Sequence, residues 1–217
     1  MGMAAEELDL RLALFFDYGQ AAARREESAS RAIAAHFGTG LEKVELPWLG
    51  RISRSALTAR ADRVPDPPGG LDGADGSTAS AVRVENRNAI LINVAAAWAS
   101  ATGCRAVVAG FNADEARTFP DNSEEFLEAV NKALQAGCEG KVRVESPTAG
   151  MDKRRIAREG LRLGIPWEEL WSCYRGRSRM CGRCESCLRL REAVRSTPAE
   201  SRVAFEAEGD RTEERDD

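Results

Sequence analysis

The sequence contains little lysine, histidine or tyrosine and has no long apolar stretch. No run of 18 or more apolar residues occurs, and no basic segment followed by an apolar one opens the chain. Neither a membrane-spanning helix nor a secretory signal is therefore indicated, and we expect a cytoplasmic protein without a membrane partner. The single histidine, His36, leaves hydrolysis by a Ser-His-Asp or Cys-His mechanism without another candidate base.

The basic residues are divided unevenly, with 27 Arg and only four Lys. Together with the abundant alanine, this bias indicates a GC-rich coding genome. The net charge is −4, whereas electrostatic binding of nucleic acid requires a net basic face. We therefore expect no direct nucleic-acid partner.

Apolar runs of strand length alternate with helical segments over much of the chain. The predicted strands are 10–17, 41–46, 105–111 and 141–145. The predicted helices end at His36, run from Asn88 to the stop at Gly103, and begin at the N-caps Ser123 and Asp152. Residues 47–83, rich in Gly, Pro, Asp and Ser, are predicted to form a long mobile loop. This alternation favours an α/β fold with a parallel sheet covered by helices on both faces.

The composition changes after Gly164, which suggests three regions. Residues 1–165 hold the alternating strands and helices, and residues 166–196 hold three aromatic residues, a cysteine cluster and a predicted helix at 188–195. Residues 197–217 are acidic and nearly free of aromatics. We expect this last stretch to be a disordered, solvated tail.

Four cysteines are packed into fifteen residues with the spacing C-x7-C-x2-C-x2-C. They are Cys173, Cys181, Cys184 and Cys187. Four thiolates from so short a segment suit tetrahedral zinc, and with every position filled by protein the zinc would be structural. Disulfides are disfavoured in a cytosolic chain, and the spacing lacks the C-x2-C-x2-C-x3-C-P run of ferredoxin iron–sulfur sites. The loop also carries arginines that can screen the thiolate charge: Arg175, Arg177, Arg179 and Arg183.

Polar residues follow the predicted strands at the edge where an open parallel sheet binds ligands. Asp17 and Tyr18 end one strand, and Asn112 follows another. Asp121 lies in the adjoining loop. Arg87-Asn88 opens the most apolar helix, where backbone N–H groups and a guanidinium can hold an anion, although Asn88 can equally be a simple helix cap.

An ordered series of motifs carries a family resemblance. The series is FDYGQ at 16–20, NRN at 86–88, AGFNADE at 109–115, FPDNSEEFLEAVNKAL at 119–134, DKRRIAREGLRLGIP at 152–166, and WSCY followed by the cysteine triplet. Over roughly residues 8–195 the chain resembles the 7-cyano-7-deazaguanine synthase family of queuosine precursor biosynthesis. The resemblance implies a Rossmann-like fold of the N-type ATP pyrophosphatase superfamily with a small zinc-binding C-terminal lobe.

The resemblance also implies an activity. ATP, with Mg²⁺, activates 7-carboxy-7-deazaguanine as an acyl adenylate, which ammonia converts to an amide that is then dehydrated to the nitrile. We expect these small molecules as partners, a structural zinc ion and a homodimer. The residues assigned to catalysis are Lys153, Asp121 and Arg87, and those assigned to substrate or ATP binding are Asp17, Tyr18, Gln20, Asn88 and Asn112.

The sequence departs from the family in one respect: it has no counterpart of the family's first strand and SGGLDS-like ATP loop. The sequence MGMAAEELDLRLALFFDYGQ matches only the end of the family's first helix and its second strand, and the glycines at 69–73 come after no strand and do not replace the loop. We expect a start placed downstream of the true one, no nitrile from the 217-residue form, and strands 10–17 and 105–111 that each lack a pairing partner. The alternatives are a catalytically impaired, zinc-containing deazapurine-binding or scaffold protein, and a pyrophosphatase acting on another carboxylate or a tRNA base.

Overall fold

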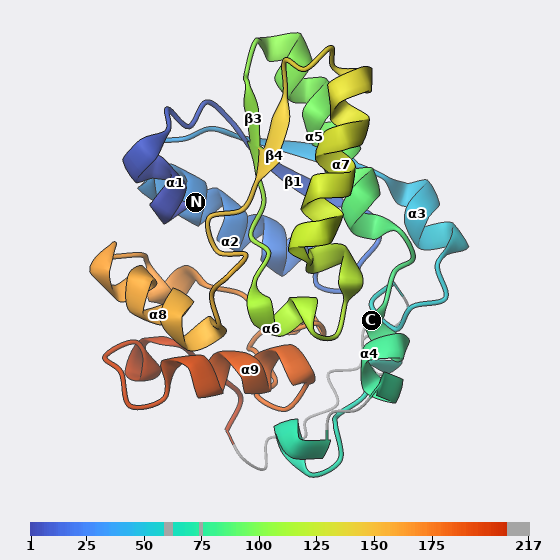
Figure 1. Cartoon of the computed structure of the whole chain (residues 1–217). Helices are drawn as coiled ribbons and strands as arrows, with labels where there is room; N and C mark the ends of the chain where they lie inside the picture. Colours follow the sequence, from blue (N-terminus) through green and yellow to red (C-terminus); the bar gives the residue numbers. More distant parts are fainter. Residues whose placement is uncertain (59–62, 74–75, 208–217) are drawn as a thin grey trace.

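The computed structural model describes residues 1–58, 63–73 and 76–207 (Figure 1). The first half contains α1 (Gly2–Glu7), β1 (Ala13–Asp17), α2 (Ala23–His36), β2 (Leu41–Glu45), α3 (Pro47–Ile52), the 3-10 helix η2 (Gly70–Gly73), α4 (Gly76–Val82) and α5 (Arg87–Thr102). The second half contains β3 (Ala106–Val108), α6 (Ala113–Ala116), η3 (Pro120–Asn122), α7 (Glu124–Gly137), β4 (Arg143–Glu145), α8 (Lys153–Arg162), η4 (Trp167–Glu169), α9 (Glu185–Val194) and η5 (Glu200–Arg202). Among the described residues, no helix is long and apolar enough to cross a membrane.

The strands form two parallel pairs. β1 pairs with β2 from Ala13 opposite Leu41 to Asp17 opposite Glu45. β3 pairs with β4, and Val107 lies opposite Val144. All four predicted strands are present, and each is shorter than predicted. In the described part of the chain the pairs are two separate sheets, so the single sheet expected from the sequence is not formed. Among the described residues, β1 pairs with β2 and β3 pairs with β4.

The helices form where the local signals placed them. The Ser123 hydroxyl accepts a hydrogen bond from the Phe126 N–H at 3.1 Å and begins α7. Asp152 caps α8 in the same way, by accepting from the Arg155 N–H at 2.7 Å. α5 ends at Gly103, whose φ of 75° favours a residue without a Cβ. α5 and α7 run alongside β3 and β4 and bury a shared apolar cluster against them (Figure 1).

A groove of about 1120 Å³ lies between the two strand pairs. β1 lines it with Leu14 and Phe16, β3 lines it with Val107, and α5 and α8 contribute Leu91 and Ile156. The edges of both strand pairs therefore open onto one largely apolar space. This groove positions the candidate site.

The connection at 47–83 is more ordered than predicted. It contains α3 and α4, and its residues Leu49, Leu57 and Val64 are buried. A Cβ on Gly50 would lie 2.4 Å from the Tyr18 carbonyl oxygen, so α3 packs closely against the turn after β1. The prediction of a long mobile loop is wrong for the described residues of this stretch, because a few buried side chains fix segments that have no periodic pattern of their own. Residues 59–62 and 74–75 lie outside the described residues.

The C-terminal segment is also more ordered than predicted. Ala199 and Val203 are buried in the apolar cluster that surrounds the cysteines. Met180 forms a parallel β-bridge with Phe205, and the Arg183 guanidinium pairs with Glu206 at 3.0 Å. The predicted disordered tail is therefore wrong for residues 197–207, because scattered apolar side chains hold this acidic stretch on the lobe. The remainder of the predicted tail, 208–217, lies outside the described residues.

Candidate metal centre and active-site groove

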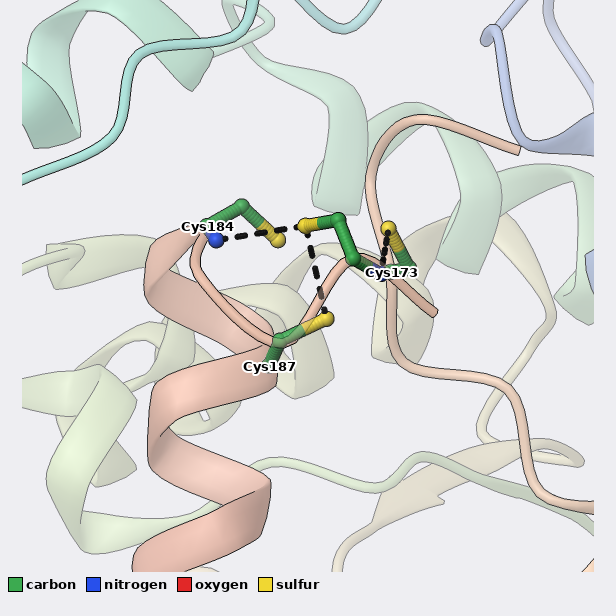
Figure 2. A group of neighbouring side chains, drawn as sticks. Cys173, Cys184 and Cys187 are labelled. Carbon is green, nitrogen blue, oxygen red and sulfur yellow. Dashed lines mark hydrogen bonds between the residues drawn. The ribbon is translucent and has the colours of Figure 1, made fainter. Parts of the chain in front are cut away.

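The four cysteines predicted as metal ligands come together in space (Figure 2). Cys184 is the N-cap of α9 and Cys187 lies in its first turn, while Cys173 and Cys181 come from the preceding loop. All four sulfur atoms lie within 4.8 Å of one another, and the cysteines are buried. The Cys181 and Cys187 sulfurs are 3.9 Å apart, far longer than a disulfide bond of about 2.05 Å.

These distances fit a zinc ion. Tetrahedral zinc with Zn–S bonds of about 2.3 Å places its sulfur ligands roughly 3.8 Å apart. Backbone N–H groups of Arg175 and Cys181 donate to the Cys173 sulfur at 3.4 Å, and the Cys184 N–H donates to the Cys181 sulfur at 3.3 Å. Such donors favour thiolates, because they satisfy lone pairs that the metal leaves free. Four protein sulfurs leave no position for a water, so a zinc ion bound here would support structure rather than chemistry.

Only one of the four arginines predicted to screen the thiolates is buried beside them. The Arg175 guanidinium donates through Nη2 to the Val64 carbonyl oxygen and to Asp66 Oδ1, both at 2.7 Å. Arg183 reaches Asp66 as well, at 3.2 Å. Arg177 is half-buried and Arg179 is exposed. Arg175 and Arg183 therefore tie the 64–66 segment to the lobe.

Three residues predicted for the active site line the polar end of the groove: Asn88, Asn112 and Lys153. Asn88 Nδ2 donates to the Asp121 carbonyl oxygen at 3.2 Å, which joins the start of α5 to η3. Asn112 Oδ1 accepts from the Glu115 N–H at 3.0 Å and caps α6. The Lys153 ammonium forms an ion pair with Glu115 at 2.6 Å. These residues give the groove lining two amide groups and one ammonium group, which can bind a polar ring edge and an anion.

Arg87 and Tyr18 form a second polar group beside Asn88. Arg87 donates through Nη1 to the Tyr18 hydroxyl at 3.3 Å and through Nε to Asn88 Oδ1 at 3.2 Å, and its guanidinium lies 5.8 Å from the centre of the Tyr18 ring. Burial raises the pKa of Tyr18, so its hydroxyl stays neutral. Among the described residues, Arg87 has no carboxylate within ion-pair distance. A guanidinium held by neutral partners can accept an anionic ligand.

Asp17 and Gln20 hold the turn after β1. Gln20 is buried; its Nε2 donates to the Phe16 carbonyl oxygen at 3.0 Å and to Glu26 Oε2 at 2.9 Å, and its Oε1 accepts from the Tyr18 N–H. Asp17 pairs with the Lys43 ammonium at 2.8 Å. Neither side chain lines the groove, so their role in binding stays a prediction.

Sequence reasoning missed three residues of this region. Glu26 is the carboxylate behind Gln20, and its burial raises its pKa. Glu115 is the partner of Lys153, and it lies within the AGFNADE motif. Tyr174 packs against both the cluster around the cysteines and the cluster around Tyr18. Glu115 and Tyr174 had a signal in the sequence, because they lie within the motifs AGFNADE and WSCY, whereas Glu26 had none.

Parallel strand pairs with connecting helices, a groove between the pairs and a buried four-cysteine centre define an α/β protein whose C-terminal cysteines can hold a metal ion. The chain matches the family described as Queuosine biosynthesis protein QueC over residues 1–197. The chain belongs to this family.

Curated relatives match most of the chain. A 7-cyano-7-deazaguanine synthase of Desulforudis audaxviator is 47% identical over 199 residues, which is 90% of this chain and 90% of the relative. The synthase of Pelotomaculum thermopropionicum is 45% identical over 85% of both chains. That of Methanosarcina mazei is 39% identical over 90% of this chain and 87% of its own. The family resemblance seen in the sequence is confirmed.

Proposed function

We propose that the chain is a 7-cyano-7-deazaguanine synthase, a ligase that converts 7-carboxy-7-deazaguanine and ammonia to the nitrile at the expense of ATP. The observation that carries this proposal is the match to synthases of that name at up to 47% identity over 90% of both chains. The groove supports it, since its polar end offers amide and ammonium groups to a small anionic heterocycle.

The reaction requires activation of a poor electrophile. The carboxylate oxygen attacks the α-phosphorus of ATP, pyrophosphate leaves, and an acyl adenylate forms. Ammonia then attacks the acyl carbon, AMP leaves and a proton is released, which gives the amide. A second ATP adenylates the amide oxygen, and loss of AMP and protons gives the nitrile. The protein must position the reactants and stabilise developing negative charge, a task for which Mg²⁺ accompanies ATP.

Residue roles are assigned from the contacts around the groove. Arg87 and Lys153 supply the cationic groups for phosphate and carboxylate oxygens, and Asn88 and Asn112 offer amides to the edge of the deazapurine. The Asp121 backbone carbonyl contacts Asn88, and we assign the Asp121 carboxylate to accept a proton from an amino group of the reactants. Asp17, Tyr18 and Gln20 act with this set by shaping the turn beside Arg87.

The domain organisation predicted from the sequence belongs to this proposal. The two parallel strand pairs and their helices make up the Rossmann-like unit of residues 1–165, and residues 166–196 form the zinc lobe. A homodimer and a cytoplasmic location stay predictions from the sequence.

Product analysis tests the function. The purified protein, both as the 217-residue chain and with in-frame sequence upstream of Met1, is incubated with 7-carboxy-7-deazaguanine, ATP, Mg²⁺ and ammonia, and the nitrile is measured by mass spectrometry. We expect ATP-dependent nitrile formation by the extended form and, as the sequence predicts, none by the 217-residue chain. Tight substrate binding without product in both forms would favour a binding protein and refute the proposal.

Lys153→Ala tests the role of the ammonium. Loss of a group that stabilises developing charge should lower the rate by about 10²-fold, or roughly 2.7 kcal/mol. Lys141→Ala is the matched control, because that lysine is exposed and pairs with Glu139 at the surface. A Lys153 variant within threefold of the parent rate, like the control, would place Lys153 outside the chemistry.

A further inference from the structure

The side chain of Lys153 is held at one place by α6. Its ammonium contacts Glu115 Oε1 at 2.6 Å, and both side chains are about three-quarters buried, at 24% and 22% exposure. The backbone N–H of the same lysine donates to Asp114 Oδ2 at 2.8 Å. Adjacent acidic residues of α6 therefore hold both the first residue of α8 and the end of its long side chain.

α6 is itself fixed from both sides. It has only four residues, and an isolated helix of that length is unstable in water. Asn112 Oδ1 accepts from the Glu115 N–H, and the Ala113 N–H donates to the Met151 carbonyl oxygen at 2.9 Å. The end of β3 and the start of α8 thus fix the position of Glu115, which makes it a rigid partner.

The location of Lys153 does not serve helix stability. A cation in the first turn of a helix opposes the helix dipole, and stability alone favours an acidic residue there. Glu115 compensates this charge, and Lys153 lines the groove together with Asn88 and Asn112. The ion pair therefore holds a groove-lining ammonium group with little freedom left in the lysine side chain.

We propose that Glu115 is a positioning residue, which holds the Lys153 ammonium where it meets the phosphate oxygens of ATP and of the adenylate. This inference rests on the proposed function. A free lysine side chain samples many rotamers, and its confinement before the reaction removes an entropic barrier from the charge-stabilising step. Glu115 itself touches no reactant in this role.

A chemical footprint tests the positioning without any turnover. The chain has only four lysines, so acetylation with limiting acetic anhydride followed by peptide mass mapping measures each one separately. In Glu115→Gln the Lys153 acetylation rate should rise at least threefold relative to Lys132. In Asp114→Asn, which alters the same short helix but keeps the ion pair, the rate should stay at the parent value. An unchanged Lys153 rate in a folded Glu115→Gln protein would overturn the proposal.

Kinetics then separate positioning from a structural role. Glu115→Gln should lower kcat by about 10-fold with little change in KM for ATP, since misplacement of a catalytic group by about an ångström is costly. In a Lys153→Ala background the same substitution should have no further effect on kcat. Additive losses would refute a role through Lys153.

If Lys153→Ala alone were fully active while the footprint changed as expected, the proposed catalytic role of Lys153 would fail and the positioning contact would stand. Should Glu115→Gln fail to fold, Glu115→Asp, which is one methylene too short for the contact, takes its place with the same expectations.

Discussion

Gly176 seats the cysteine-bearing loop on the start of α2, and replacing it with alanine should measure that contact. A Cβ at this position would lie 2.3 Å from the Ala21 carbonyl oxygen and 2.8 Å from the Ala22 Cα, and neither backbone atom can rotate away. The residue also has a φ of 66°, where alanine costs about 1–2 kcal/mol. Overpacking adds about 1–3 kcal/mol, so Gly176→Ala should destabilise the protein by roughly 2–5 kcal/mol.

Gly38→Ala is the matched control for this substitution. Its φ is 67°, nearly the same, and a Cβ there would meet nothing within 4 Å. It should therefore show the conformational cost alone. Thermal unfolding of both zinc-loaded variants, followed by circular dichroism, gives the comparison, at roughly 2–4 °C per kcal/mol for a chain of this size. Equal shifts in the two variants would refute the close seating of the lobe on α2.

Two further substitutions test the metal centre and a buried carboxyl group. Cys184→Ser should abolish the zinc content measured by elemental analysis and strongly reduce the soluble yield, because structural zinc sites contribute about 10–16 kcal/mol in small peptides. Stoichiometric iron in the parent protein would contradict a zinc centre. Burial raises the pKa of the Glu26 carboxyl group above its ordinary value. The folded protein therefore keeps the carboxyl proton to a higher pH than the unfolded chain does. As a result, the free energy of unfolding falls as pH rises from about 4.5 through the raised pKa. Glu26→Gln, which can still accept from Gln20, should remove that decline in urea unfolding between pH 4.5 and 8; a parent-to-variant difference that is independent of pH would contradict it.

The parts of the structure that the sequence predicted correctly depend on local signals. Ser123, Asp152 and Gly103 act on backbone groups within a few residues, so their helices begin and end where predicted. The strands were visible as apolar runs, and the cysteine spacing brought its four sulfurs together as a metal centre requires. Each of these features is encoded in fewer than about twenty consecutive residues.

The parts that were not predicted depend on contacts between distant segments. Residues of the 47–83 connection gain order from buried side chains such as Val64, whose carbonyl oxygen accepts from Arg175 across more than one hundred residues of sequence. The acidic composition after Thr197 concealed Ala199 and Val203, which are buried against the lobe. Likewise, no local pattern pairs Glu115 with Lys153. In each case the partner lies too far along the chain for periodicity or spacing to reveal it.

The four-cysteine centre is linked to the groove through the loop that carries Cys173. Cys173 stands between Ser172, which lines the groove, and Tyr174, which packs against the apolar cluster around Tyr18. Three residues further on, Gly176 rests on Ala21, next to the Gln20 amide that orders the turn carrying Tyr18. Because Tyr18 in turn accepts from Arg87, the position of this guanidinium depends on the seating of the cysteine-bearing loop. A zinc ion held by the four cysteines would fix this loop and with it the position of Arg87, and we expect its removal to weaken ligand binding before it unfolds the strands.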